Sequence, residues 1–129
     1  MRRIFLIGLA AASVGCYKQR SIVGEWSTRA DVGSGTLIFR EDCTFRAVRE
    51  APLASLLLDG TYEYKGETLR LHVVKWGVPR GPKLSPHDQE EMNRSLQTDS
   101  ISTVRWTDDN HIQISGGDGN LTTAERVSK

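Results

Sequence analysis

The chain has 129 residues, 26% of them charged, and a formal net charge of +1 at pH 7. Removing Arg2 and Arg3 from its 17 basic residues leaves 15 against 16 acidic residues, a net charge of −1. This balance argues against a nucleic-acid-binding protein, which usually carries a basic surplus, and the length suits one small domain.

The first element is an export signal. Arg2 and Arg3 precede an uncharged apolar run at residues 4–12, which is far shorter than the roughly 20 residues that span a bilayer. Ser13-Val14-Gly15-Cys16 then resembles a lipobox, the site of bacterial lipoprotein signal peptidase. The resemblance implies a signal peptide at 1–15 and acyl chains on Cys16, and ordinary secretory cleavage is the alternative.

Acylation would anchor the protein to the cell envelope, with residues 16–21 as a lipidated tether. Ser13 departs from the leucine usual at that lipobox position. Residue 17 is Tyr rather than the Asp that retains enterobacterial lipoproteins in the inner membrane. By that analogy we expect the outer membrane, on its periplasmic side.

Strand signals begin at residue 22. Short apolar–polar alternations occupy 22–28, 36–40 and 44–48, and the last two form a predicted hairpin. Leu37 and Phe39 share one face of their strand.

An apolar stretch at 53–58 precedes a second hairpin. Its strands are predicted at 61–64 and 68–74, joined by a tight turn at Lys65-Gly66. Leu69 and Leu71 lie on one face of the second strand.

Glycines and prolines crowd residues 77–85 and predict a loop rather than a strand. Ser85 suits a helix N-cap and Pro86 the first helical position. We therefore predict a weakly amphipathic surface helix from Pro86 to about Gln97.

Strands return at 100–106, 111–115 and 120–127, the last two around Asp118-Gly119. The sequence thus predicts an all-β fold, a small antiparallel up-and-down barrel of about eight strands with one short helix between strands five and six. A small sandwich is the alternative.

Several motifs, in this order, are similar to those of small bacterial lipocalin-like lipoproteins. Gly24-Glu25-Trp26 resembles the lipocalin Gly-x-Trp motif, and Arg126 stands where lipocalins place a basic residue against that Trp. Residues 37–45 and 60–71 resemble the hairpins of these lipoproteins. Cys43, in place of the usual turn glycine, and the insert at 77–99 depart from the pattern.

The resemblance implies a barrel at 22–129 whose apolar interior binds a small hydrophobic ligand. Eight strands can enclose one such molecule or be filled by side chains, and both readings stay open. The residues expected to line or fill the interior are Leu37, Phe39, Tyr62, Leu69 and Leu71.

Other candidate chemistry is sparse. His72, His87 and His111 lack metal-ligand spacing, so we expect no metal and no cofactor. Asp108-Asp109 and Asp118 are explained by turns, in which Asp is favoured. Cys43 is interpreted as a substituted turn residue, and a reactive or pairing thiol is the alternative. The basic residues around Trp76 suggest either a contact for lipid headgroups or glycans, or a core Trp beside solvated charges; they are Lys75, Arg80 and Lys83.

These observations favour a non-enzymatic, monomeric, lipid-anchored envelope protein that binds a small apolar ligand. The alternative is an interaction lipoprotein that binds an envelope protein or glycan through the insert at 77–99. Inhibition of an envelope-directed hydrolase fits size and location without a supporting motif, and an enzymatic function ranks last.

Overall fold

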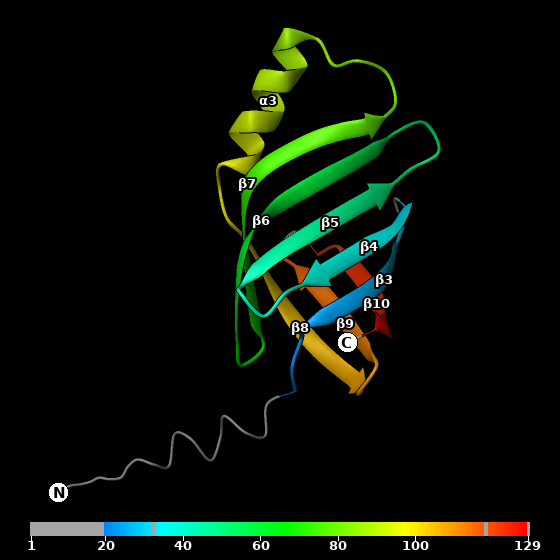
Figure 1. Ribbon diagram of the computed structural model, residues 1–129, viewed down its shortest axis with the longest axis vertical. Helices are drawn as coiled ribbons and strands as arrows, with labels where there is room; N and C mark the ends of the chain where they lie inside the picture. Colours follow the sequence, from blue (N-terminus) through cyan, green and yellow to red (C-terminus); the bar gives the residue numbers. More distant parts are fainter. Residues whose placement is uncertain (1–19, 32, 118, 129) are drawn as a thin grey trace, which may run out of the picture.

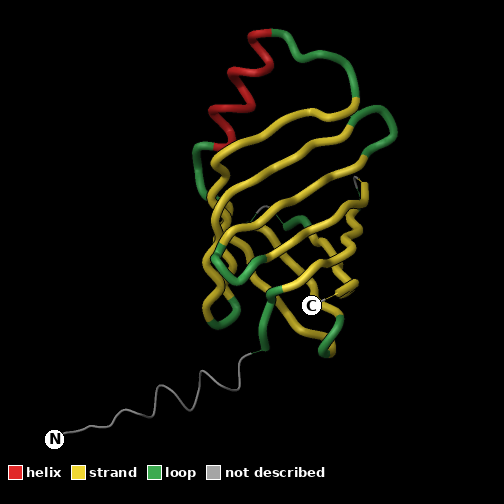
Figure 2. Tube along the Cα trace, viewed as in Figure 1, coloured by secondary structure: helices red, strands yellow, loops and turns green. Residues whose placement is uncertain are grey.

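The computed structural model describes residues 20–31, 33–117 and 119–128. The expected signal peptide at 1–15, Cys16 and Tyr17 lie outside these residues. The described chain forms a closed antiparallel barrel in which each strand pairs with its neighbours in sequence and the last strand pairs with the first (Figures 1 and 2). The predicted up-and-down barrel is confirmed.

The described strands number eight, and one helix lies between the fifth and sixth. The strands are β3 (Gly24–Ala30), β4 (Gly33–Phe39), β5 (Thr44–Glu50), β6 (Ser55–Lys65), β7 (Thr68–Arg80), β8 (Ser100–Asp108), β9 (His111–Gly116) and β10 (Leu121–Ser128). The helix is α3 (Pro86–Leu96). It stands at one end of the molecule, and the chain enters β3 at the other (Figure 1).

Strand alternation decides which side chains face inward. Residues directly opposite each other on paired strands share a face, so the fully buried Trp26 identifies its partners on β4, β5 and β6 as inward-facing. Inward side chains from seven of the described strands and Ile22 make the buried core, and β6 adds the half-buried Leu58, Tyr62 and Tyr64. The buried members of the core are Ile22, Trp26, Leu37, Phe39, Phe45, Leu69, Val104, Ile112 and Ala124.

The expected loop at residues 77–80 is wrong, because β7 continues through Pro79 to Arg80. β7 pairs with β8 only over Thr68–Leu71, while its far end pairs with β6 alone. A proline is tolerated on such an edge because its missing N–H faces no partner strand. The apolar stretch at 53–58 likewise belongs mostly to β6, which is continuous and carries an irregularity between Asp59 and Gly60.

Helix α3 begins and ends where the sequence predicts. The Ser85 hydroxyl accepts a hydrogen bond from the Asp88 N–H (3.1 Å) and Pro86 opens the first turn. None of its residues is buried, although Met92 and Leu96 are half-buried. The helix therefore lies on the surface, as its sparse apolar side chains indicate.

The turn between β4 and β5 explains Cys43. Its φ of 68° is in the left-handed region, where glycine is normally favoured. The Cys43 N–H donates to the Arg40 carbonyl (3.1 Å), and the Asp42 carboxylate accepts from the Thr44 N–H (3.1 Å). The thiol is free and exposed, so its place in the fold is that of a turn residue.

Candidate functional site at the open end of the barrel

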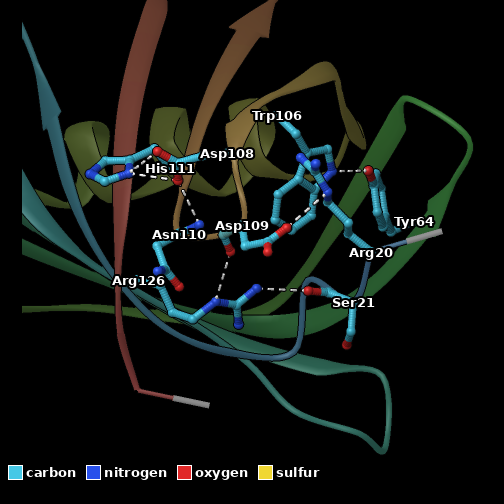
Figure 3. A network of polar contacts seen from close by, with 9 residues as sticks. All are labelled: Arg20, Ser21, Tyr64, Trp106, Asp108, Asp109, Asn110, His111 and Arg126. Carbon is cyan, nitrogen blue, oxygen red and sulfur yellow. Dashed lines mark hydrogen bonds and ion pairs between the residues drawn. The ribbon is translucent and has the colours of Figure 1, made fainter. Parts of the chain in front are cut away.

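One end of the barrel, which we call the base, is closed around Arg126. Its guanidinium lies 4.4 Å from the centre of the Trp26 ring and 5.9 Å from that of Trp106, close enough for cation–π attraction. It also donates hydrogen bonds to the carbonyls of Val23 (2.8 Å) and Ser21 (2.9 Å). Arg126 thereby ties the entering chain across this end (Figure 3).

Other polar groups of the base are also paired within the protein. The Trp26 indole N–H donates to the Ile22 carbonyl (3.0 Å), and that of Trp106 donates to the Tyr64 hydroxyl (2.9 Å). Arg20 forms an ion pair with Asp109 (3.2 Å). Burial lowers the pKa of the Arg126 guanidinium from its usual range. Arg126 stays protonated, and the carbonyls that accept its hydrogen bonds stabilise this charge. The base is a structural closure.

The expected lining residues divide between two environments. Leu37, Phe39 and Leu69 are buried in the core, whereas Tyr62 and Leu71 are only half-buried. Tyr62 packs edge-on against Phe39, with ring centres 4.8 Å apart, and its hydroxyl donates to the Arg40 carbonyl (2.8 Å). Three of the five residues thus fill the barrel, and the other two pack against this core.

The opposite end is open on its inner side. There β5, β6 and β7 extend beyond β8 as a curved sheet (Figure 1). The inner face of β6 and β7 carries Leu56, Leu58 and Trp76, all half-buried. We call these three residues the apolar wall.

Small side chains face this end from β3 and β4. Register places Thr28 opposite Gly35 and Ala30 opposite Gly33, on the same face as Trp26. A Cβ at Gly33 would collide with the Glu50 carbonyl and one at Gly35 with the Val48 carbonyl. The close approach of β4 to β5 thus requires glycine, and the space beside the apolar wall stays unfilled by these positions.

A cleft of about 470 Å³ adjoins the wall, between the end of β7 and the start of α3. It is lined by Trp76, Gly77, Val78, Gly81, Pro82, Lys83, Leu84 and Gln89. The Trp76 indole N–H donates to the Asn93 side chain (2.6 Å), and His72 lies 2.8 Å from the Asp99 carboxylate. These two contacts hold the insert against β7 where β8 no longer pairs with it.

The sequence does contain patterns that point to the residues of the open end, although none of these residues was among the expected lining residues. Leu56 and Leu58 alternate on one strand face, and Arg49 continues the alternation of Phe45 and Ala47. The sequence around Trp76 shows only basic neighbours and does not indicate that Leu58 lies opposite it. Only the register across β5, β6 and β7 brings these residues to one surface.

The remaining candidates lie apart from the open end. His111 contacts Asp108 (2.8 Å) and Glu125 (3.4 Å) on the exposed outer face, beside a shallow groove of about 310 Å³ between β9, β10 and β3. His87 pairs with Glu91 on α3 (3.2 Å). Within the described residues no three His, Cys, Asp or Glu side chains gather to hold a metal ion. Asp118 lies outside them.

Comparisons with known proteins support the fold alone. No protein-family model matches the chain, and no curated protein matches it. An uncharacterized protein from Bacteroides eggerthii superposes with a TM-score of 0.50 at 12% identity, over 82% of this chain and 99% of that one. A protein from Burkholderia xenovorans has a TM-score of 0.43 at 12% identity, over 100% and 96% of the chains. Among the described helices none is long and apolar enough to cross a membrane.

Proposed function

We propose that this protein is a non-enzymatic, lipocalin-like lipoprotein of the cell envelope that binds a small apolar ligand at the open end of its barrel. The observation that carries the proposal is the apolar wall: Leu56, Leu58 and Trp76 face inward yet remain half-buried. Apolar surface that faces inward and stays partly exposed is typical of a ligand site, and Trp76 also lines the neighbouring cleft.

The contrast with the base supports this reading. At the base Trp26 is 0% exposed and its indole N–H is hydrogen-bonded, so no further partner is needed there. At the open end the small residues of β3 and β4 leave room, and burying the three side chains of the wall under a ligand would gain roughly 25 cal/mol for each Å² removed from water.

Acylation at Cys16 would orient the site. Cys16 precedes Arg20 by four residues, and four residues span at most about 14 Å. The base, where Arg20 and Ser21 lie, would therefore face the membrane. The open end would face the aqueous side and take its ligand from there.

The test is binding of N-phenyl-1-naphthylamine, an uncharged apolar fluorophore. The mature chain, residues 16–129 carrying Cys16→Ser, contains the whole described barrel. We expect enhanced fluorescence on titration, and about tenfold weaker binding by Leu58→Asn, which puts an amide on the wall. Ile101→Asn is the matched control, because Ile101 is 52% exposed on the outer face. No binding by the unaltered chain would refute the proposal.

The alternative, an interaction lipoprotein, has its own support. Helix α3 has no buried residue and is anchored through Trp76 and Asn93, so its outer surface is free to contact an envelope protein or glycan. Charge reversal at Glu90 and Glu91, both exposed, is then expected to abolish capture of the partner while probe binding is unchanged. Retained capture would count against this alternative.

A further inference from the structure

Two arginines account for the charged side chains on the inner face of the described strands. Arg126 is opposite Trp26. Arg49 lies two residues beyond Ala47, and Ala47 belongs to the inward row that contains Trp26, Leu37 and Leu58. Alternation therefore places Arg49 on the same face, one row nearer the open end, between Gly35 and Leu56.

The two arginines differ in their partners. Arg126 donates to three main-chain carbonyls and stacks on two tryptophans. The Arg49 side chain has no hydrogen bond, ion pair or ring contact in the described part of the chain. Its neighbour Gly35 contributes no side chain, and Arg49 is exposed.

Among the described residues no carboxylate forms an ion pair with Arg49 on this face. Glu50 points to the opposite side of β5 by alternation, and it pairs with Arg80 at 3.1 Å. The open end thus combines the apolar wall with one unpaired cation, and Leu56 of that wall is directly opposite Arg49.

We infer that Arg49 binds the acidic head of an amphiphilic ligand, a single-chain carboxylate or phosphate, whose apolar tail lies on Leu56, Leu58 and Trp76. This inference rests on the proposed function and narrows its ligand class. A guanidinium presents two parallel N–H donors to two oxygens of a carboxylate or phosphate. The apolar wall alone cannot distinguish such an acid from an uncharged chain of equal length.

The experiment is displacement of N-phenyl-1-naphthylamine from the mature chain by dodecanoate, dodecyl phosphate and 1-dodecanol, below their micellar concentrations. We expect the two anions to bind about ten- to hundredfold more tightly than the alcohol, the factor expected for hydrogen bonds to a charged group. Preference for one anion over the other identifies the head group as carboxylate or phosphate.

Arg49→Gln is expected to remove the preference for the anions and to leave probe and dodecanol binding unchanged. Arg29→Gln is the matched control, because Arg29 lies on the outer face of β3 by alternation with Trp26 and Thr28, and it is expected to keep the preference. Arg49→Lys keeps the charge without the paired donors and is expected to retain part of it.

Equal binding of the alcohol and the anions, or an unchanged preference in Arg49→Gln, would overturn this inference and leave the proposed function standing. Failure of both the probe and dodecanol to bind would overturn the proposed function, and this inference with it.

Discussion

The base and the open end of the barrel each contain a tryptophan and an arginine on the inner face, but the burial and the partners of these residues differ. At the base, Trp26 is fully buried and Arg126 is held by carbonyls and rings. At the open end, Trp76 is half-buried and Arg49 is unpaired. At the base the aromatic ring and the cation stabilise the fold because they contact each other. At the open end they do not, and we propose that there they contact a ligand.

Truncation in the two regions should give the largest contrast. Trp26→Ala removes a fully buried ring and its hydrogen bond to Ile22, and we expect it to lower the free energy of unfolding by about 3–5 kcal/mol. Leu58→Ala removes a half-buried side chain, and we expect a loss of about 1 kcal/mol. Urea denaturation measures both.

Equal losses of unfolding free energy in these two variants would contradict the conclusion that the base stabilises the fold more than the open end does. A Trp26→Ala chain that does not fold at all would agree with it, and Trp26→Phe then provides a measurable intermediate loss.

The arginines provide a second contrast. Arg126→Gln leaves the part-buried Val23 carbonyl and the Ser21 carbonyl without their charged donor, and we expect a loss of about 2–3 kcal/mol in the free energy of unfolding. Arg49→Gln breaks no side-chain hydrogen bond or ion pair of the described residues, so its effect should lie within about 0.5 kcal/mol. A large loss for Arg49→Gln in thermal or urea denaturation would show that Arg49 has a structural partner.

The contact that holds α3 to β7 can be tested by itself. Trp76→Phe and Asn93→Ala each remove the 2.6 Å hydrogen bond between these side chains, which contributes about 1 kcal/mol. We expect amide hydrogen exchange in α3 to become about fivefold faster, while β9 is unaffected. The double variant should add little to either single one, and additive effects would contradict a shared contact.

The smallest expected effect is electrostatic and lies at the hairpin before β9. The hydrogen bond that His111 donates to the Asp108 carboxylate raises the pKa of His111, and Glu125 adds a weaker contribution. Asp108→Asn should therefore move the NMR titration midpoint of His111 down toward the ordinary value of about 6.5. Glu125→Gln should move it less, and the reverse order would refute this assignment.

The sign of the accompanying stability change follows from linkage. Because the folded pKa of His111 is raised, its contribution is present below the unfolded pKa and is lost as pH rises through the folded value. The pKa of Asp108 is lowered by the same hydrogen bond, so its contribution is lost as pH falls through the folded value. Both groups are exposed, so the change in stability is small.

Local patterns were sufficient for much of the fold. Alternation around Leu37, Phe39 and Leu69 places these residues inside, and Ser85-Pro86 marks the start of the helix. The extension of β7 through Gly77 and Pro79 was not predictable from such patterns, because a breaker excludes only a strand with partners on both sides.

The candidate site was predictable only in part. Tyr62 and Leu71 lie on the inner face, as expected, but they pack against the core and are not part of the apolar wall. Arg49 and Trp76 become part of the candidate site only through their neighbours on other strands. A cation at an alternating position is ordinary on a surface strand. It becomes a candidate ligand contact only where the opposite positions are Gly35 and Leu56.

The sequence by itself determined the strands, the helix and the alternation that separates the inner from the outer face, because these depend on side chains a few residues apart. The tertiary structure decided where the barrel is filled and where it is open. That outcome depends on register between strands and on where the pairing of β7 with β8 stops. Neither is encoded within any one segment.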